Sequence, residues 1–519
     1  MFSTFIKSEN ILLISTKAWS DFASHIPLIR SFSLGSNFPP EYPLFAGPVI
    51  KYHFGYYAGI GFLEKIGIPI DLALNIPSTL GFMLLVFMIY SFAVKVFKSK
   101  TVGILSVIFF IFNSSLSYIY YFQKNSFSLE SIFKIPLIKD FQSFAPYGDG
   151  VISAFWNLNI YTNQRHLPLS FAVSLIIILI FIKPLIEKKK IDYKISLILG
   201  IVLGSTFFLH FAVLVMTAST IFFLGILFSK IRKSAFIILL IGGLIALPQY
   251  LYISSSSENS NLMLNIGYLI SDKLTLFNFF QFWILNLGLS IILIPLGFIF
   301  SNKFQKKILL SFIPLFFIGN LFQFSPEIAA NHKFFNYFLI IGNMYSAYAL
   351  IIIWNKKIIL KPLVIIAIFF MIFGGIIDIF PIINDKKVSI PDYEVNPNSS
   401  WIINNTASDS VFLNTTFLYN PASIAGRKIF FGWPYFAWSQ GYNTYERERI
   451  FKTILESTSK EEICILLSEN NINYIEINTE EINNPDIPKF SSLWKNEFNP
   501  IFVSTNNYKI FNTNNLCNL

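Results

Sequence analysis

Side chains able to exchange protons gather at a few places along this chain, and the first is an acid and imidazole pair near its beginning. Asp21 and His25 stand at positions i and i+4. If residues 17–33 form a helix, both side chains lie on the same face, one turn apart, where they can converge. Such a pair predicts acid/base chemistry or orientation of a substrate, and His53 follows in the same segment. A polar helix with solvated side chains is the alternative, and the sequence leaves both open.

A second polar string comes directly before a long apolar run. Asp149 is followed by Asn163, Gln164, Arg165 and His166. Polar residues at such a boundary commonly anchor a helix at the membrane interface. A guanidinium also donates a bidentate pair of hydrogen bonds to phosphate oxygens, so Arg165 and His166 are candidate phosphate ligands.

A third string, Asn331, His332 and Lys333, opens another apolar run. A lysine at the start of a span can lie beside the phosphate of a lipid carrier, and snorkelling of its side chain to the interface is the alternative. His210 and Asn286 interrupt apolar runs, so they either line a cavity or make hydrogen bonds between helices.

The elements that carry these residues are predicted to be membrane-spanning helices. Of the 519 residues, 54% are hydrophobic and 13% are charged, whereas a soluble domain carries about 25% charged residues. The net charge of +10 comes from short basic clusters between apolar runs, which indicates topology signals and no nucleic-acid partner. No phosphate-binding loop, dinucleotide fingerprint or hydrolase motif stands in a fitting context.

Ten apolar runs reach or approach the roughly 20 residues that cross a bilayer. The stretch 195–229 is too long for one ordinary span, and we predict two short helices joined near His210. The predicted spans are 73–97, 101–121, 167–187, 195–209, 211–229, 233–252, 276–300, 306–324, 335–354 and 358–381.

Basic residues cluster in alternate loops, which predicts that these loops face the cytoplasm. The basic loops are 95–100, 183–194, 230–233, 303–307 and 356–361. The polar strings described above and both ends of the chain then lie on the extracytoplasmic side. Because nothing before residues 1–72 can carry them across, we expect a spanning helix to be missing from the front; a translocated N-terminal tail is the alternative.

The sequence therefore predicts a mainly α fold, a polytopic α-helical membrane protein with a small C-terminal α/β domain outside the membrane. The predicted parts are an extracytoplasmic loop region at 1–72, a transmembrane domain of about ten helices at 73–384, and the C-terminal domain at 385–519. Short strands are predicted at 411–413 and 474–477, with a helix around 445–468. The two cysteines, Cys464 and Cys517, permit a disulfide, but their spacing does not argue for one.

These strings, in this order and on this side, resemble the GT-C integral membrane glycosyltransferases, a superfamily that includes protein O-mannosyltransferases, aminoarabinose transferases and oligosaccharyltransferases. The similarity covers nearly the whole chain. The segments that carry it are Trp19-Ser20-Asp21, Asn37-Phe38-Pro39-Pro40, Tyr52-His53-Phe54, Asn163–His166, Asn331–Lys333, Gly426-Arg427, Gly432-Trp433-Pro434 and Gly441-Tyr442.

The resemblance implies inverting, single-displacement transfer of a hexosyl or pentosyl group from a polyprenyl-phosphate donor to a lipid, glycan or protein acceptor. Phosphate leaves as a stable anion, so one carboxylate base is enough. Asp21 is the predicted base with Asp149 in reserve, and Arg165, His166, His332 and Lys333 are the predicted phosphate partners. The first segment lacks the paired Asp-X-Asp form of some members, so no divalent metal or other cofactor is implied.

The resemblance also places the protein in the plasma membrane with its C-terminal domain outside the cytoplasm. A transporter or flippase of lipid-linked saccharides is an alternative, although no internal repeat is visible. A non-enzymatic receptor or scaffold is another, and its C-terminal domain would then bind a ligand when expressed alone.

Overall fold

The computed structural model describes residues 1–143, 150–190, 192–254, 263–270, 273–478, 480, 488–505 and 508–517. By its internal contacts the chain divides into two compact units. The first contains Met1, Ile76–Tyr250 and the described residues from Met263 to Lys386. The second contains Phe2–Asn75, the end of one helix from Leu251, and the described residues from Lys387 on.

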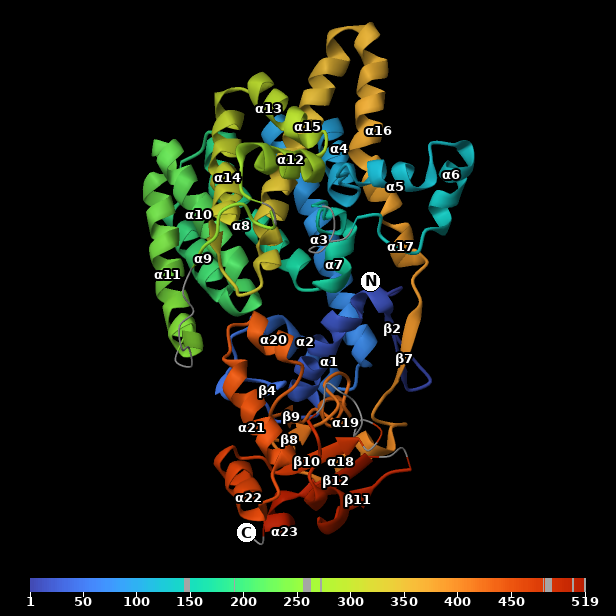
Figure 1. Ribbon diagram of the computed structural model, residues 1–519. Coiled ribbons are helices and arrows are strands. Elements are labelled where there is room, and N and C mark those ends of the chain that lie inside the picture. The colour runs from blue at the N-terminus through green and yellow to red at the C-terminus, as the bar shows by residue number, and fades with distance from the viewer. Residues whose placement is uncertain are drawn as a thin grey trace. The chain divides into compact units, whose positions relative to one another are not determined.

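Long apolar helices make up the first unit (Figure 1). Seven helical stretches in the described part of the chain are long and apolar enough to cross a membrane, and a bent pair brings the number to eight. They are α3 (Ile70–Phe97), α8 (Leu167–Glu187), α10 (Phe207–Leu227), α11 (Arg232–Ser254), α14 (Lys303–Leu321), α15 (His332–Lys356) and α16 (Lys361–Ile377), with α12 (Leu276–Leu287) and α13 (Ser290–Phe300) as the bent pair.

Each of the ten predicted apolar runs contains a helix. Apart from the run of the bent pair, two runs hold no helix long enough to span, and their apolar helices are α4 (Lys100–Ile111) and α9 (Tyr193–Ser205). Whether these two cross the membrane stays a prediction. Between the long helices lie α5 (Ser117–Asn125), α6 (Leu129–Lys134), α7 (Leu158–Asn163), α17 (Phe380–Ile383) and the pair β5 (Met263–Leu264) and β6 (Phe322–Gln323).

Helix α15 is the centre of the first unit, because it packs against α4, α13, α14 and α16. Within its apolar window 72% of the residues are buried, against 11% in α11. At the crossing with α13, a Cβ added to Gly297 would overlap with the carbonyl oxygen of Tyr345. Close approach of two backbones through a small residue is how helices associate in lipid.

The second unit contains the predicted C-terminal α/β domain. Its five-stranded sheet has the order β11-β12-β10-β8-β9. The strands are β8 (Val411–Asn414), β9 (Lys428–Ile429), β10 (Tyr474–Asn478), β11 (Phe502–Val503) and β12 (Tyr508–Asn512), and β8 pairs in parallel with both β9 and β10. The helices are α18 (Pro397–Asn405), α19 (Pro421–Ile424), α20 (Pro434–Ser439), α21 (Thr444–Glu456), α22 (Lys460–Glu469) and α23 (Thr513–Cys517).

Both predicted strands are confirmed, as β8 and β10, whereas the single helix predicted around 445–468 is two. The chain breaks between α21 and α22 because the Ser459 side chain accepts a hydrogen bond from the Glu462 backbone N–H and so caps α22.

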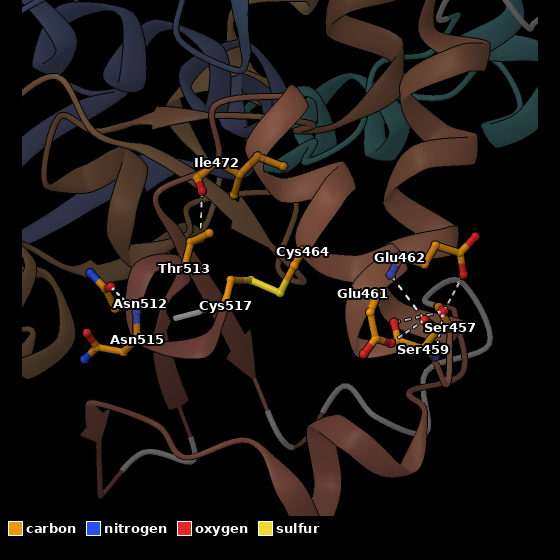
Figure 2. Close-up of a disulfide and its surroundings, with 10 residues drawn as sticks. All are labelled: Ser457, Ser459, Glu461, Glu462, Cys464, Ile472, Asn512, Thr513, Asn515 and Cys517. Carbon is orange, nitrogen blue, oxygen red and sulfur yellow. Dashed lines mark hydrogen bonds between the residues drawn. A yellow bond between two sulfur atoms is a disulfide. The ribbon is translucent and has the colours of Figure 1, made fainter. Parts of the chain in front are cut away.

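A disulfide joins Cys464 on α22 to Cys517 on α23 (Figure 2), with the two Cα atoms 5.6 Å apart. Beside it the Thr513 hydroxyl donates to the Ile472 carbonyl over 2.7 Å. The bond therefore fastens the end of the chain to the helix that precedes β10.

Residues 2–75 form strands and helices and belong to the same unit as the C-terminal domain. Strands β1 (Phe5–Ser8), β2 (Ile11–Ser15) and β7 (Lys387–Pro391) form an antiparallel sheet in that order. The segment also forms α1 (Trp19–Ser33), the hairpin of β3 (Glu41–Tyr42) and β4 (Phe45–Val49), and α2 (Gly55–Lys65).

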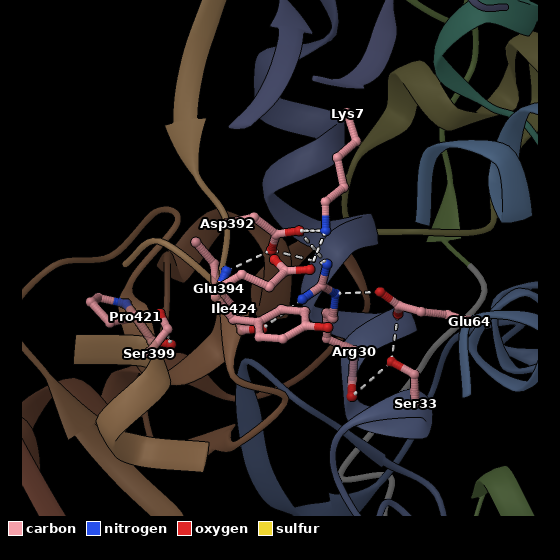
Figure 3. Close-up of polar contacts among 10 residues, drawn as sticks. Lys7, Arg30, Ser33, Glu64, Asp392, Glu394, Ser399, Pro421 and Ile424 are labelled. Carbon is pink, nitrogen blue, oxygen red and sulfur yellow. Dashed lines mark hydrogen bonds and ion pairs between the residues drawn. The ribbon is translucent and has the colours of Figure 1, made fainter. Parts of the chain in front are cut away.

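A buried ion network ties these segments together (Figure 3). The fully buried Arg30 on α1 pairs with Glu64 on α2 at 2.8 Å and with Asp392, just after β7, at 3.0 Å. Lys7 on β1 pairs with Asp392 at 2.8 Å. Burial raises the pKa of Glu64 despite Arg30. Burial also opposes ionisation of Asp392, but Arg30 and Lys7 outweigh it and hold the pKa of that carboxyl below its usual value.

Candidate active site

Imidazole and ammonium groups from three elements of the first unit come together in one cluster. His166 precedes α8, His210 lies within α10, and His332 and Lys333 open α15. The rings of His166 and His210 have centroids 5.1 Å apart, and both residues are buried. His210 interacts electrostatically with His166, Lys333 and His332. With Gln164, these residues form what we call the histidine cluster.

The His332 ring is held by amides on both sides. The Gln164 amide nitrogen lies 3.0 Å from His332 Nε2, and the Asn336 amide nitrogen lies 3.4 Å from Nδ1. A neutral imidazole has one donor and one acceptor nitrogen. One amide therefore donates through its nitrogen, and the other turns its oxygen toward the ring N–H. Phe155 packs against the ring at 4.9 Å. The imidazole is therefore fixed in orientation, as a residue that binds a ligand must be.

His210 owes its position to a break in its helix. Its backbone is extended, with φ −169° and ψ 98°, within otherwise helical α10. The predicted junction of two short helices is thus a gap at Thr206 between α9 and α10, followed by a kink at His210.

A cavity of about 10 Å³ adjoins this kink, enough for about one water molecule. Its lining is mostly polar side chains of α8 and α10, and comprises Ser170, Ser174, Ile177, Thr206, His210, Val213 and Thr217.

Arg165 is fully buried and donates to backbone carbonyls. Its Nε lies 2.6 Å from the Thr162 oxygen and its Nη2 lies 3.1 Å from the Met1 oxygen. These bonds fix the turn between α7 and α8, next to His166. A direct role for Arg165 in holding phosphate stays a prediction.

The predicted asparagines position backbone. Asn331 donates to the carbonyls of Gly319 and Phe322, which holds the turn before α15. Asn286 accepts from the Ile152 N–H and the Trp156 indole, each at 2.9 Å. Its amide also donates to the carbonyls of Gly150 and Phe282. Asn163 ends α7 and accepts from the Thr162 hydroxyl over 3.3 Å.

Asp378, at the end of α16, is a buried carboxylate that the sequence analysis missed. It accepts from the Ser153 hydroxyl and, over 2.8 Å, from the Asn157 amide. Its carbonyl accepts from the Asn159 amide over 3.1 Å. The network holds the segment that leads into α7 and the histidine cluster. A carboxylate at the end of an apolar run was the available signal, because ionisable groups at membrane depth are rarely incidental.

Asp21 and His25 lie one turn apart on α1 of the second unit, as predicted. Asp21 is partly buried and interacts electrostatically with Tyr52, Tyr57 and Tyr419. Burial, then Tyr52, Tyr56 and Asp21, raise the pKa of Tyr57, so its hydroxyl keeps its proton.

His25 is buried against Tyr57, with ring centroids 4.7 Å apart, so it is not a solvated side chain. The His53 and Tyr52 rings have centroids 3.8 Å apart, with their planes tilted by 31°. Tyr419 donates to the Trp19 carbonyl over 2.5 Å. Asp21 therefore stands among aromatic rings and ordered hydroxyls. Asp149 lies outside the described residues.

Comparison with solved structures identifies this architecture. The chain is similar to the archaeal oligosaccharyltransferase AglB from Archaeoglobus fulgidus in complex with an inhibitory peptide and a dolichol-phosphate, with a TM-score of 0.51 and 11% identity over 90% of this chain and 66% of that one. The apo form of the Archaeoglobus fulgidus enzyme gives a TM-score of 0.50 and 12% identity over 90% and 67%. No protein-family model and no curated protein matches the sequence.

The chain thus has the GT-C fold of the membrane glycosyltransferases and spans about two thirds of the length of the structures it matches. It is a multi-pass membrane protein of mainly α structure with a C-terminal α/β domain, which confirms the predicted fold class.

Proposed function

We propose that this protein is a membrane glycosyltransferase that moves a sugar from a polyprenyl-phosphate donor to an extracytoplasmic acceptor. The observation that carries the proposal is the histidine cluster inside a unit of GT-C fold. A buried group of imidazoles beside an ammonium suits an anionic ligand, and the AglB structure contains a dolichol-phosphate. We carry the lipid phosphate over to this chain as the leaving group.

In this mechanism the cluster stabilises charge on the departing phosphate. Lys333 supplies a full positive charge and His166 donates a hydrogen bond, while His332 would reach the phosphate in exchange for one of its two amide partners, Gln164 or Asn336. Arg165 takes part through the turn that carries His166, or directly.

Asp21 is the proposed general base that removes the acceptor hydroxyl proton, with Asp149 as the reserve candidate. One base suffices for inverting displacement of a phosphate, which needs no proton to leave. The donor sugar is a hexose or pentose, and the acceptor is a lipid, glycan or protein. We propose no divalent-metal requirement, because the first segment has a lone Asp21 in place of a paired acidic motif.

The proposed location is the plasma membrane with the C-terminal domain on the extracytoplasmic side. The alternation of basic loops supports this side. So does the disulfide between Cys464 and Cys517, because disulfides persist outside the reducing cytoplasm.

The test is donor kinetics of Lys333→Gln in liposomes that contain EDTA, radiolabelled polyprenyl-phosphate hexose or pentose, and crude acceptor membranes. We expect kcat/KM for the donor to fall at least tenfold, since the phosphate loses a charged hydrogen-bond donor. Lys356→Gln, at the exposed far end of the same helix, should keep wild-type kinetics.

Equal kinetics for both lysine variants would contradict the phosphate role. Movement of the intact donor across the bilayer without sugar transfer would show a transporter instead. Loss of transfer in EDTA that added Mn²⁺ or Zn²⁺ restores would overturn the metal-free mechanism.

A further inference from the structure

The C-terminal domain contains an open pocket of about 340 Å³, at the lower end of the range for small-molecule sites, ~300–1,000 Å³. Its floor consists of Phe431 and Phe451, each 1% exposed, with ring centroids 5.6 Å apart. Phe417 packs 5.9 Å from Phe451 and 5.8 Å from Trp433. The floor is therefore well packed and belongs to the core of the domain.

Two large aromatic side chains of the wall remain open to solvent. Trp433 is 41% exposed and Tyr435 is 43% exposed, and both line the pocket at the start of α20. Leaving such rings in water forgoes the stabilisation that burial of large aromatic surfaces gives. An exposed indole at the mouth of a hollow indicates a flat, partly apolar ligand.

The rim carries one acid and one base. Glu448 and Lys452 line the pocket from α21, and their side chains are joined by a 2.7 Å hydrogen bond. The pair is neutral overall, yet it offers carboxylate acceptors and ammonium donors side by side. A ligand that fits this rim is uncharged and carries several groups that both donate and accept hydrogen bonds.

We propose that this pocket binds a neutral sugar ring. The C–H face of a pyranose packs on the Trp433 indole, while its hydroxyls reach Glu448 and Lys452. A site that binds a bilayer surface is expected to be a convex apolar patch, whereas this pocket is a hollow with a charged pair on its rim. The site lies in the C-terminal domain, is distinct from the histidine cluster, and does not depend on the transfer reaction.

The experiment is ligand binding to the purified full-length protein in a detergent without a sugar headgroup, since a glycoside detergent would compete. Glucose, mannose, galactose, N-acetylglucosamine and their disaccharides are titrated, with calorimetry and saturation-transfer NMR as readouts. We expect saturable binding of at least one neutral sugar and at least tenfold weaker binding by Trp433→Ala. Glu448→Gln should weaken binding less, since the amide keeps an acceptor.

Trp438→Ala is the matched control, because Trp438 is 42% exposed on the same helix and does not line the pocket. It should bind like the wild type. No saturation with any of these sugars, or equal loss in both tryptophan variants, would overturn the proposal. So would phosphatidylcholine and phosphatidylglycerol vesicles binding in place of sugar, with the same loss in both variants. Thermal melting of both variants near the wild-type temperature shows that each is folded.

Discussion

Asp21, the proposed base, interacts electrostatically with Tyr52 and the fully buried Tyr57, and His25 lies one turn away on the same helix. Asp21→Asn keeps the shape of the side chain but removes its ability to accept a proton. We expect turnover to fall by about 10²–10⁴-fold, measured as the initial rate of sugar transfer. Membrane insertion should be unchanged.

The control is Asp409→Asn, the same exchange at an exposed carboxylate of the C-terminal domain, which should transfer at the wild-type rate. Undiminished turnover by Asp21→Asn would show that Asp21 is not the base.

The sequence predicted which side chains lie close together better than it predicted the contacts that each side chain makes. His332 and Lys333 were predicted as one string, and the structure places them with His166 and His210. The hydrogen bonds of Arg165 to the Thr162 and Met1 carbonyls could not be predicted, because they depend on how a turn closes. Asp378 was passed over because its partners lie more than 200 positions away.

The two carboxylates that flank Arg30 are expected to respond oppositely to pH. The pKa of Asp392 is lowered from its usual 3.8, so its stabilising effect is complete above pH 3.8 and is lost as pH falls through the folded-state value. The pKa of Glu64 is raised from 4.5, so its contribution is complete below pH 4.5 and is lost as pH rises through the folded-state value.

Asp392→Asn should therefore lower the free energy of unfolding most at neutral pH, by about 3–5 kcal/mol as for other broken buried pairs, and by less below pH 3.8. Glu64→Gln should lower the free energy of unfolding least at neutral pH and by more at about pH 4.5. Hydrogen exchange of the amides in β2 and β7, corrected for intrinsic rates, measures both. Costs that change with pH in the same direction would contradict the assigned pKa shifts.

At the scale of elements, the crossing of α13 and α15 depends on a glycine. A Cβ on Gly297 would overlap with the backbone at Tyr345, which no side-chain rotation relieves. Gly297→Ala should therefore separate the two helices and lower the melting temperature of the purified protein. Gly243→Ala in α11 is the control, since that Cβ would meet no atom within 4 Å. It should be neutral or stabilise by about 0.5–1 kcal/mol through helix propensity.

A lower melting temperature for Gly243→Ala than for Gly297→Ala would show that this crossing is not tightly packed.

The length of the apolar runs predicted where helices occur, but it did not predict the breaks within them, which occur at polar residues or at glycine. The run 101–121 is two helices, because the chain turns between them at Asn113, Ser114 and Ser115. The Ser114 hydroxyl accepts a hydrogen bond from the Gly374 N–H, and the Asn113 side-chain oxygen accepts one from the Asn343 amide. The run 276–300 bends by 85° between α12 and α13. Gly288 has a φ of +53° there, which favours glycine.

At the scale of the whole molecule, the grouping of distant segments was beyond a sequence pattern. Strand β2 pairs with β7, and Arg30 bonds to Asp392, across more than 350 positions. Hydropathy separated membrane helices from polar segments because each helix satisfies its own backbone. It could not show that residues 2–75 fold with the C-terminal domain, since sheet pairing between remote strands leaves no local period.

The side of the membrane on which the C-terminal domain folds can be tested through its disulfide. In the chain-entropy estimate, closing a loop of 53 residues stabilises the fold by about 4 kcal/mol, so the double variant Cys464→Ser, Cys517→Ser should unfold at lower urea. On intact cells, a membrane-impermeant maleimide should label the wild type only after an impermeant phosphine has reduced the bond. Lys189→Cys, in a loop predicted to be cytoplasmic, should be labelled only after permeabilisation. Labelling of the wild type before reduction would mean that the bond is absent, and labelling that requires permeabilisation would place the domain in the cytoplasm and reverse the proposed topology.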